Sequence, residues 1–397
     1  MFKKRGAPGE YRGLWAEKKL LIGITTLVGT IVGAGILGIP YVIAKAGLLY
    51  GSLLIIGIGL AFLFLNLSLG EVVLRTREQH QLTGYAEKYL GKKGKILMFC
   101  AMVVNIYGAL TAYLIGEGKT LHTILGWGSP LLYSLLFFIA GSWIVYNGIK
   151  ATGRMEFFLI GLLFVVVILI GVFSLNKISV DNLSTFNPAF FFLPYGVVIF
   201  AFMASPGIPE VQEELGRSKE KMKRAIIIGS IIPIILYLVF TFIIVGIVGL
   251  DNFEALSPNE RIATVALSLY SSSLLGILAN VLAVLTMFTS YLVLGTALME
   301  MFHYDYKFPR RGAFLMTVLL PLFIVLLDVT HFIRVLGVTG AIAGGLDGTL
   351  VLLMFWRAKK RGDRVPEYSL KPHYVVGGLL IILFATGMIH QLWMQLG

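Results

Sequence analysis

Two short segments rich in glycine and proline interrupt runs of apolar residues in this chain. Residues 29–40 read GTIVGAGILGIP, and residues 200–210 read FAFMASPGIPE. Proline has no N–H for the carbonyl four residues earlier, and glycine inside a helix costs about 1 kcal/mol relative to alanine. The first segment is therefore predicted to unwind near Val32–Gly35 and to start a new helix just after it, where free N–H groups attract an anion. Close packing of small residues is the alternative explanation of its glycines.

Asp347 is the acidic residue with the deepest position in an apolar segment. It lies beside Gly344, Gly345 and Gly348. Acidic side chains at such positions are functional candidates, for example as proton carriers. A buried carboxyl held by local backbone donors is the alternative, and the sequence leaves both open.

The remaining polar residues predict no catalytic chemistry. Glu71 precedes Arg75 by four residues, which predicts an ion pair on one helix face. Glu117 falls near the end of its apolar segment, where a carboxylate costs little. The single cysteine, Cys100, excludes an intrachain disulfide and is expected to be buried. The sequence contains no paired Cys/His metal spacing, no phosphate-binding loop and no nucleophile elbow. We therefore expect no enzyme and no cofactor.

The elements that position these residues are predicted to be transmembrane helices. The chain has 397 residues, of which 57% are hydrophobic and 14% charged, against about 25% charged in soluble domains. Residues 225–250, 262–299 and 372–397 contain no Asp, Glu, Lys or Arg, and about 20 apolar residues suffice to span a bilayer. This composition predicts an all-α multi-pass protein in the lipid bilayer. It excludes a cytosolic enzyme, a disordered chain and a nucleic-acid-binding protein.

Hydropathy and loop signals predict eleven spans and four parts of the chain. The parts are a tail (1–18), a first five-helix repeat (19–175), a second five-helix repeat (189–356) and an eleventh helix (372–395). The spans are 19–44, 48–74, 95–118, 129–147, 154–175, 189–215, 223–249, 273–301, 312–328, 332–356 and 372–395.

The positive charge follows this topology. Of the 33 Lys and Arg residues, 28 fall in segments on the N-terminal side of the predicted membrane. Because Lys and Arg are retained in the cytoplasm, the N-terminus is predicted to be cytoplasmic and Gly397 extracytoplasmic. The net charge of +12 is thus explained by topology and by anionic lipid, with no need of a nucleic acid.

The second interrupted segment lies five spans after the first. Five is an odd number, so the second repeat enters the membrane from the opposite side and the two repeats are inverted. Paired broken helices at corresponding places of inverted repeats indicate the binding site of a secondary transporter.

The motifs GTIVGAGILGIPYVIAKAG (29–47), EVQEE (210–214) and TSYL (289–292) are similar to amino acid permeases of the amino acid–polyamine–organocation superfamily. The similarity is greatest to the amino acid/auxin and the hydroxy/aromatic amino acid permease branches. It implies a five-plus-five inverted-repeat fold like that of the leucine transporter, with helices 1 and 6 broken. It also implies symport of an amino acid, neutral or aromatic, with sodium or protons across the cell membrane.

The resemblance implies a role for several residues. The substrate carboxylate would meet the amides of Gly33, Ala34 and Gly35, and the ammonium group would meet carbonyls between Phe202 and Ser205, Ala204 included. Phe200 or Phe202 would cover the substrate, with core packing as the alternative for either.

The resemblance also implies an inner cation site. Its ligands would be Gly29, Val32, Thr286, Thr289 and Ser290, although such hydroxyls readily hydrogen-bond to their own helix instead. For proton coupling, Asp347 is the candidate. Alternatives for the whole chain are a non-transporting amino-acid sensor on the same fold, or a permease for another small amine or purine-like solute. The oligomeric state stays open.

Overall fold

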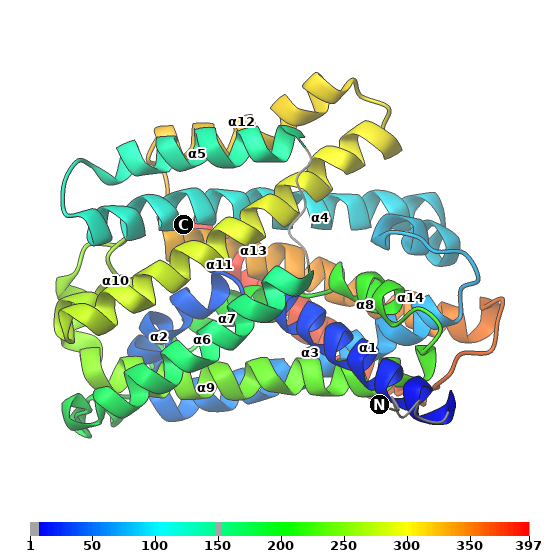
Figure 1. Ribbon diagram of the computed structural model, residues 1–397, viewed down its shortest axis with the longest axis horizontal. Coiled ribbons are helices and arrows are strands. Elements are labelled where there is room, and N and C mark those ends of the chain that lie inside the picture. Colours follow the sequence, from blue (N-terminus) through cyan, green and yellow to red (C-terminus); the bar gives the residue numbers. More distant parts are fainter. Residues whose placement is uncertain (1–7, 148–152, 397) are drawn as a thin grey trace, which may run out of the picture.

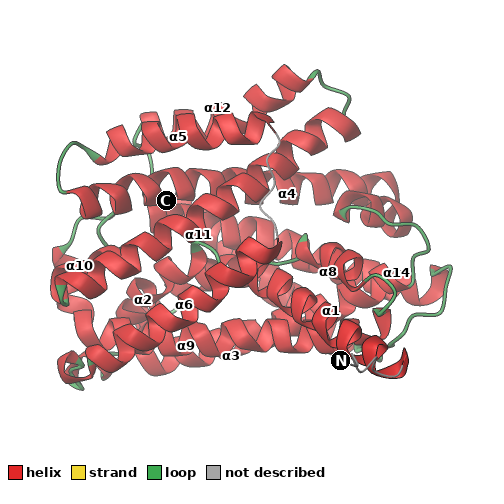
Figure 2. Cartoon of the chain, in the orientation of Figure 1, coloured by secondary structure: helices red, strands yellow, loops and turns green. Residues whose placement is uncertain are grey.

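The computed structural model describes residues 8–147 and 153–396, and its regular elements there are helices (Figures 1 and 2). In Figure 1, α3 and α9 lie along the lower edge and α5 and α12 along the upper edge. The elements are α1 (Pro8–Ile31), α2 (Gly35–Ala46), α3 (Leu48–Leu74), α4 (Leu82–Leu125), α5 (Pro130–Asn147), α6 (Gly153–Phe173), η1 (Leu175–Lys177), η2 (Asp181–Leu183), η3 (Pro188–Phe190), α7 (Leu193–Phe202), α8 (Gly207–Leu215), η4 (Lys219–Lys221), α9 (Met222–Ala255), α10 (Ala263–Tyr270), α11 (Ser273–Glu300), η5 (Met301–Asp305), α12 (Arg310–Leu326), α13 (Phe332–Thr339), η6 (Gly340–Gly344), α14 (Gly345–Arg361) and α15 (Tyr374–Leu396).

Both predicted helix breaks are confirmed. In the first span, α1 ends at Ile31 and α2 begins at Gly35, with a bend of 54° between them. In the sixth span, α7 ends at Phe202 and α8 begins at Gly207, directly after Pro206. Proline suits this place because its fixed φ is compatible with the start of a helix. Glu210 lies in the first turn of α8, where its charge complements the helix dipole.

The two broken spans pack against each other in a crossed manner. The helix α2 lies against α7, and α1 lies against α8. A β-carbon placed on Gly35 would lie 2.5 Å from the Cα of Ala201, and one on Gly207 would lie 2.6 Å from the Thr30 hydroxyl. The approach to the Ala201 backbone requires glycine at position 35, and a side chain at position 207 would displace the Thr30 side chain. An inverted repeat would produce this crossed arrangement.

The number of spans by length and composition is smaller than the eleven predicted. Within residues 8–147 and 153–396, seven helices are long and apolar enough to cross a membrane, and the bent pair α1–α2 makes an eighth. The apolar part of α6, Phe158–Phe173, and the 17-residue α12 are shorter, and the sixth span is divided at its break. The count of eleven therefore stays a prediction.

Three local expectations differ from the structure. The helix α4 begins at Leu82 rather than near residue 95, because its first part is joined to the rest across a kink at Gly91, whose φ of 77° favours glycine. A short helix, α10, forms in the predicted loop 250–272. Cys100 is exposed on the surface of α4 and not buried, as expected for a side chain on a lipid-facing helix side.

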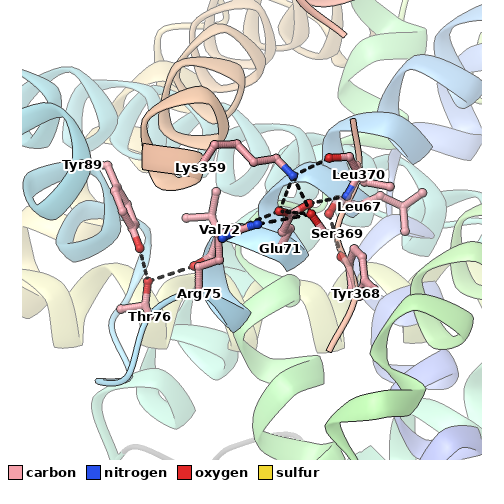
Figure 3. Close-up of polar contacts among 10 residues, drawn as sticks. All are labelled: Leu67, Glu71, Val72, Arg75, Thr76, Tyr89, Lys359, Tyr368, Ser369 and Leu370. Atoms are coloured by element: carbon pink, nitrogen blue, oxygen red, sulfur yellow. Dashed lines mark hydrogen bonds and ion pairs between the residues drawn. The ribbon is translucent and has the colours of Figure 1, made fainter. Parts of the chain in front are cut away.

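The predicted pair of Glu71 and Arg75 is confirmed and belongs to a larger cluster (Figure 3). The Glu71 carboxylate is fully buried and accepts hydrogen bonds from Arg75 Nε at 2.7 Å, Lys359 Nζ at 2.5 Å and the Leu370 N–H at 2.6 Å. The Ser369 hydroxyl donates a fourth, at 3.2 Å. A buried charge is tolerated when it is paired and hydrogen-bonded in this way. The cluster fastens the end of α3 to α14 and to the segment before α15.

Candidate functional site

A cavity of about 130 Å³ lies at the first helix break. It is enclosed by five spans, namely the broken pairs α1–α2 and α7–α8 together with α4, α6 and α11. Its lining residues are Gly29, Thr30, Ile31, Val32, Gly33, Gly35, Asn105, Ala109, Tyr113, Leu159, Ile160, Leu163, Phe200, Met203, Pro206, Gly207, Glu210, Thr286, Thr289, Ser290, Val293, Leu294 and Ala297.

The cavity extends from the break toward the side of the membrane that holds the N-terminus. Its walls there are the end of α1, the start of α8, the start of α6 and the later turns of α11. On the opposite side lies a smaller space of about 20 Å³, whose lining includes Ile36, Leu37, Phe240 and Leu282. The structure thus represents a state whose central cavity continues toward the side of the N-terminus.

Most of the predicted site residues meet in this cavity. Gly33, Gly35 and Phe200 line it, as do the five residues predicted to hold a cation, which are Gly29, Val32, Thr286, Thr289 and Ser290. A β-carbon placed on Gly33 would lie 3.3 Å from the Tyr113 hydroxyl and 3.6 Å from the Ser290 hydroxyl. The break therefore faces two hydroxyl groups from α4 and α11, and the first amides of α2 have no partner within their own helix.

Five predicted residues lie outside the cavity lining, namely Ala34, Phe202, Ala204, Ser205 and Asp347. Ala34 and Ala204 are fully buried. Phe202 is buried against Phe62 and Tyr237, with ring centroids 6.5 Å and 5.0 Å away, so of the two phenylalanines only Phe200 reaches the cavity.

Ser205 and Asp347 form a buried pair beside the second break. The Ser205 hydroxyl donates a hydrogen bond to the Asp347 carboxylate, which lies in the first turn of α14. The structure thus joins one residue predicted to bind substrate to one predicted to couple protons. Neither residue of the pair lines the cavity.

The hydroxyls of α11 are engaged with their own helix as donors. Thr286 donates to the carbonyls of Leu282 and Ala283, and Thr289 donates to those of Leu285 and Thr286. Both oxygens keep lone pairs that can face a cation. No group of three or more His, Cys, Asp or Glu side chains placed to hold a metal occurs within the described ranges.

The sequence interpretation missed the contribution of α4 and of Tyr237. Asn105, Ala109 and Tyr113 line the cavity, and their spacing of four residues places a small residue between two polar ones on one helix face. That pattern was available in the sequence. The Tyr237 hydroxyl lies 3.0 Å from the Ile31 carbonyl and 2.8 Å from the Ala201 carbonyl, so it hydrogen-bonds at the ends of both broken helices. No sequence signal pointed to this contact.

Charged residues join the elements on the side of the cavity opposite the N-terminus. Glu260 accepts a hydrogen bond from Lys119 at 3.0 Å, and this contact together with Ser257 lowers the pKa of its carboxyl to about 2. Glu254 pairs with Lys45 at 2.8 Å, which holds the pKa of Glu254 below its usual value. The segment 256–262 is thereby tied to α4, and the end of α9 to the end of α2.

Comparison with known proteins decides the family. A model of the tryptophan/tyrosine permease family matches residues 16–394. The chain belongs to this family. Membership confirms the predicted resemblance to aromatic amino acid permeases, and it confirms a membrane protein that is not an enzyme.

Relatives of this permease align over most of its length. It is 24% identical to tyrosine-specific transport system 1 of Haemophilus influenzae, over 93% of this chain and 94% of the relative. It is 25% identical to glutamine transporter 2 of Aliivibrio fischeri, over 92% and 95%. It is 23% identical to the low affinity tryptophan permease of Escherichia coli K12, over 61% and 62%.

The fold of the permease is also that of a solved transporter. The crystal structure of MhsT in complex with L-phenylalanine superimposes with a TM-score of 0.66 at 20% identity, covering 95% of this chain and 98% of MhsT. This likeness confirms the predicted leucine-transporter-like fold.

Proposed function

We propose that the protein is a secondary active transporter of amino acids, neutral or aromatic, that works by alternating access and is coupled to a sodium or proton gradient. The observation that carries the proposal is the cavity between the two helix breaks, with apolar walls and the start of α2 at one end. Relatives described as transporters of tyrosine, tryptophan and glutamine support an amino acid as the substrate.

The cavity offers complementary groups for a zwitterion. The carboxylate binds at the amides of Gly33, Ala34 and Gly35, where the start of α2 contributes a positive dipole end. The ammonium group binds carbonyls freed at the second break, between Phe202 and Ser205. The side chain of the substrate contacts Phe200 and the apolar wall of α6, which suits an aromatic ring.

The coupling cation binds next to the substrate. For sodium, the ligands are the carbonyls of Gly29 and Val32 and hydroxyls of α11, since oxygen atoms suit this hard ion. For protons, the buried carboxyl of Asp347 is the candidate. The protein resides in the cell membrane with its N-terminus in the cytoplasm, and the excess of Lys and Arg on that side supports this orientation.

Uptake into proteoliposomes tests the function. Purified protein is reconstituted and offered labelled tyrosine, tryptophan, phenylalanine and glutamine, with sodium and pH gradients imposed separately. We expect concentrative uptake of at least one of them, and counterflow exchange without any gradient. Binding without counterflow for every amino acid would favour a sensor and contradict the proposal.

A further inference from the structure

Glu117 is a buried carboxyl without a partner. It lies in α4, its side chain is 0% exposed, and neither of its oxygens has a hydrogen bond. A position near the end of an apolar segment had suggested a hydrated carboxylate, but the structure encloses it completely. Burial of an unpaired carboxylate is far more costly than burial of the neutral acid. The structure therefore fits Glu117 in its protonated form.

The position of Glu117 connects the cavity to the outer side. It follows Tyr113 by four residues, so it lies on the same helix face, about 6 Å farther along α4. Tyr113 lines the cavity, and its hydroxyl faces Gly33 of the first break. In the other direction, Lys119 forms the ion pair with Glu260 that ties α4 to the outer segment 256–262.

The helices around Glu117 supply no counter-charge. Gly116 faces Met287 of α11 and Phe332 of α13, while Gly118 faces Ser134 of α5, so Glu117 is set among α5, α11 and α13. No charged or hydrogen-bonding group among the described residues interacts with its carboxyl. The titratable groups on α4 nearby and on α5, α10, α11 and α13 are Tyr113, Lys119, His122, Tyr133, Tyr146, Tyr270, Tyr291, Glu300 and Arg334. Two further helices packed against α4, α12 and α14, hold Arg310, Arg311, Asp347, Arg357, Lys359, Lys360 and Arg361.

We propose that Glu117 is a proton-binding site, loaded when the outer side closes and emptied when it opens. The inference rests on the proposed transport function. In the state observed here, a small space of about 20 Å³ lies on the outer side, and Glu117 is fully buried. When the segment 256–262 separates from α4, water reaches the carboxyl from outside and it loses its proton. Closure requires the proton again, so the outer pH controls the rate at which the substrate is enclosed.

The pH profile of uptake tests this site. Initial uptake is measured while the outer pH is raised from mildly acidic to alkaline at fixed inner pH. We expect the wild-type rate to fall with rising pH, and the Glu117→Gln variant, which resembles the protonated acid, to lose that fall. Glu117→Asp keeps a titratable group and should retain the dependence. Thr120→Val is the matched control, because Thr120 has a buried hydroxyl without a partner on the same face but no carboxyl.

A second readout does not require transport. Substrate is added to the protein in weakly buffered detergent solution, and a pH indicator measures the protons taken up or released. We expect a change in the number of bound protons in wild type and none in Glu117→Gln. An unaltered pH profile and an unaltered proton change in Glu117→Gln would overturn the proposal. Counterflow at constant pH distinguishes a failure of the transport function from a failure of the Glu117 proposal. If wild type shows no counterflow, the transport function itself is contradicted. If wild type shows counterflow, the pH profile decides the role of Glu117.

Discussion

Gly33 and Gly35 are two residues apart in the first break, yet a side chain would meet different surroundings at each. At Gly33 a β-carbon would point toward two hydroxyl groups across the cavity, at 3.3 Å and 3.6 Å. At Gly35 it would lie 2.5 Å from the backbone of Ala201, which cannot move aside without displacing α7. The first glycine therefore keeps space for a ligand, and the second allows two helices to touch.

The two positions are expected to give opposite phenotypes. Gly33→Leu fills the cavity, so the affinity for substrate should fall about tenfold or more, equal to about 1.4 kcal/mol or more, while the protein stays folded. Gly35→Ala overpacks the contact with α7 and should cost about 1–3 kcal/mol of stability. Ligand binding by scintillation proximity and thermal unfolding in detergent measure the two effects. Undiminished affinity in Gly33→Leu would show that the break is only a kink.

The hydroxyl pair Thr289 and Ser290 tests sodium coupling. Replacement of both by alanine removes two oxygen ligands, and the carbonyls of the first break alone cannot offset the dehydration of the ion. We expect the double variant to lose the sodium stimulation of uptake and to keep exchange that needs no gradient. Wild-type uptake that is indifferent to sodium, combined with a normal double variant, would reject the sodium site.

At this scale the sequence predicted the backbone of the site better than its side chains. Glycine and proline mark the breaks by themselves, because their effect on a helix is local. The positions of Phe202, Ser205 and Asp347 depend on how three helices pack, and the sequence contains no local sign of that packing. Glu117 was misjudged for the same reason, since depth along a helix does not reveal what surrounds it.

Among the elements, the segment 256–262 is joined to α4 by the ion pair between Glu260 and Lys119. The folded-state pKa of Glu260, about 2, lies below the ordinary value of about 4.3. A lowered pKa means that the stabilisation is present above about pH 4.3 and is lost as the pH falls toward 2. Glu260→Gln should therefore lower the melting temperature near neutral pH, and its difference from wild type should shrink on acidification.

Thermal unfolding in detergent at a series of pH values measures this difference. Glu220→Gln changes an exposed acid in the connection between α8 and α9, and serves as the matched control without such a trend. A difference in melting temperature between Glu260→Gln and wild type that does not change with pH would contradict a stabilising role of the Glu260 ion pair. The short α10 that follows was not predicted, because a helix of eight residues is too brief for a hydropathy signal.

For the whole molecule, topology is the property that the charge distribution predicts most directly. In a background without Cys100, a cysteine in place of Asp181, in the segment between α6 and α7, should react with an impermeant thiol reagent on intact cells. A cysteine in place of Glu220, between α8 and α9, should react only after permeabilisation. Both residues are exposed in the structure. The reverse pattern would contradict the predicted orientation and the inversion of the repeats.

The overall fold was predictable because composition, hydropathy and paired breaks are each properties of long segments. Composition required helices in a bilayer, and the two breaks five spans apart indicated an inverted repeat. Contacts between distant segments could not be predicted, such as the crossed packing of α1 on α8 and α2 on α7. The kink at Gly91 was not predicted either, because a single glycine in a long helix does not by itself indicate a kink.

The cluster around Glu71 has a consequence for biosynthesis. Its acid lies in the second span, whereas Lys359, Ser369 and Leu370 are made almost three hundred residues later. While the ribosome completes the chain, Glu71 has only Arg75 of its own helix as a partner, so the end of α3 must wait at the water boundary with its charge hydrated. Glu71 can therefore become buried only after α14 and the segment before α15 have packed against the end of α3. The contacts around Glu71 are thus completed only after residues 359–370 have been synthesised.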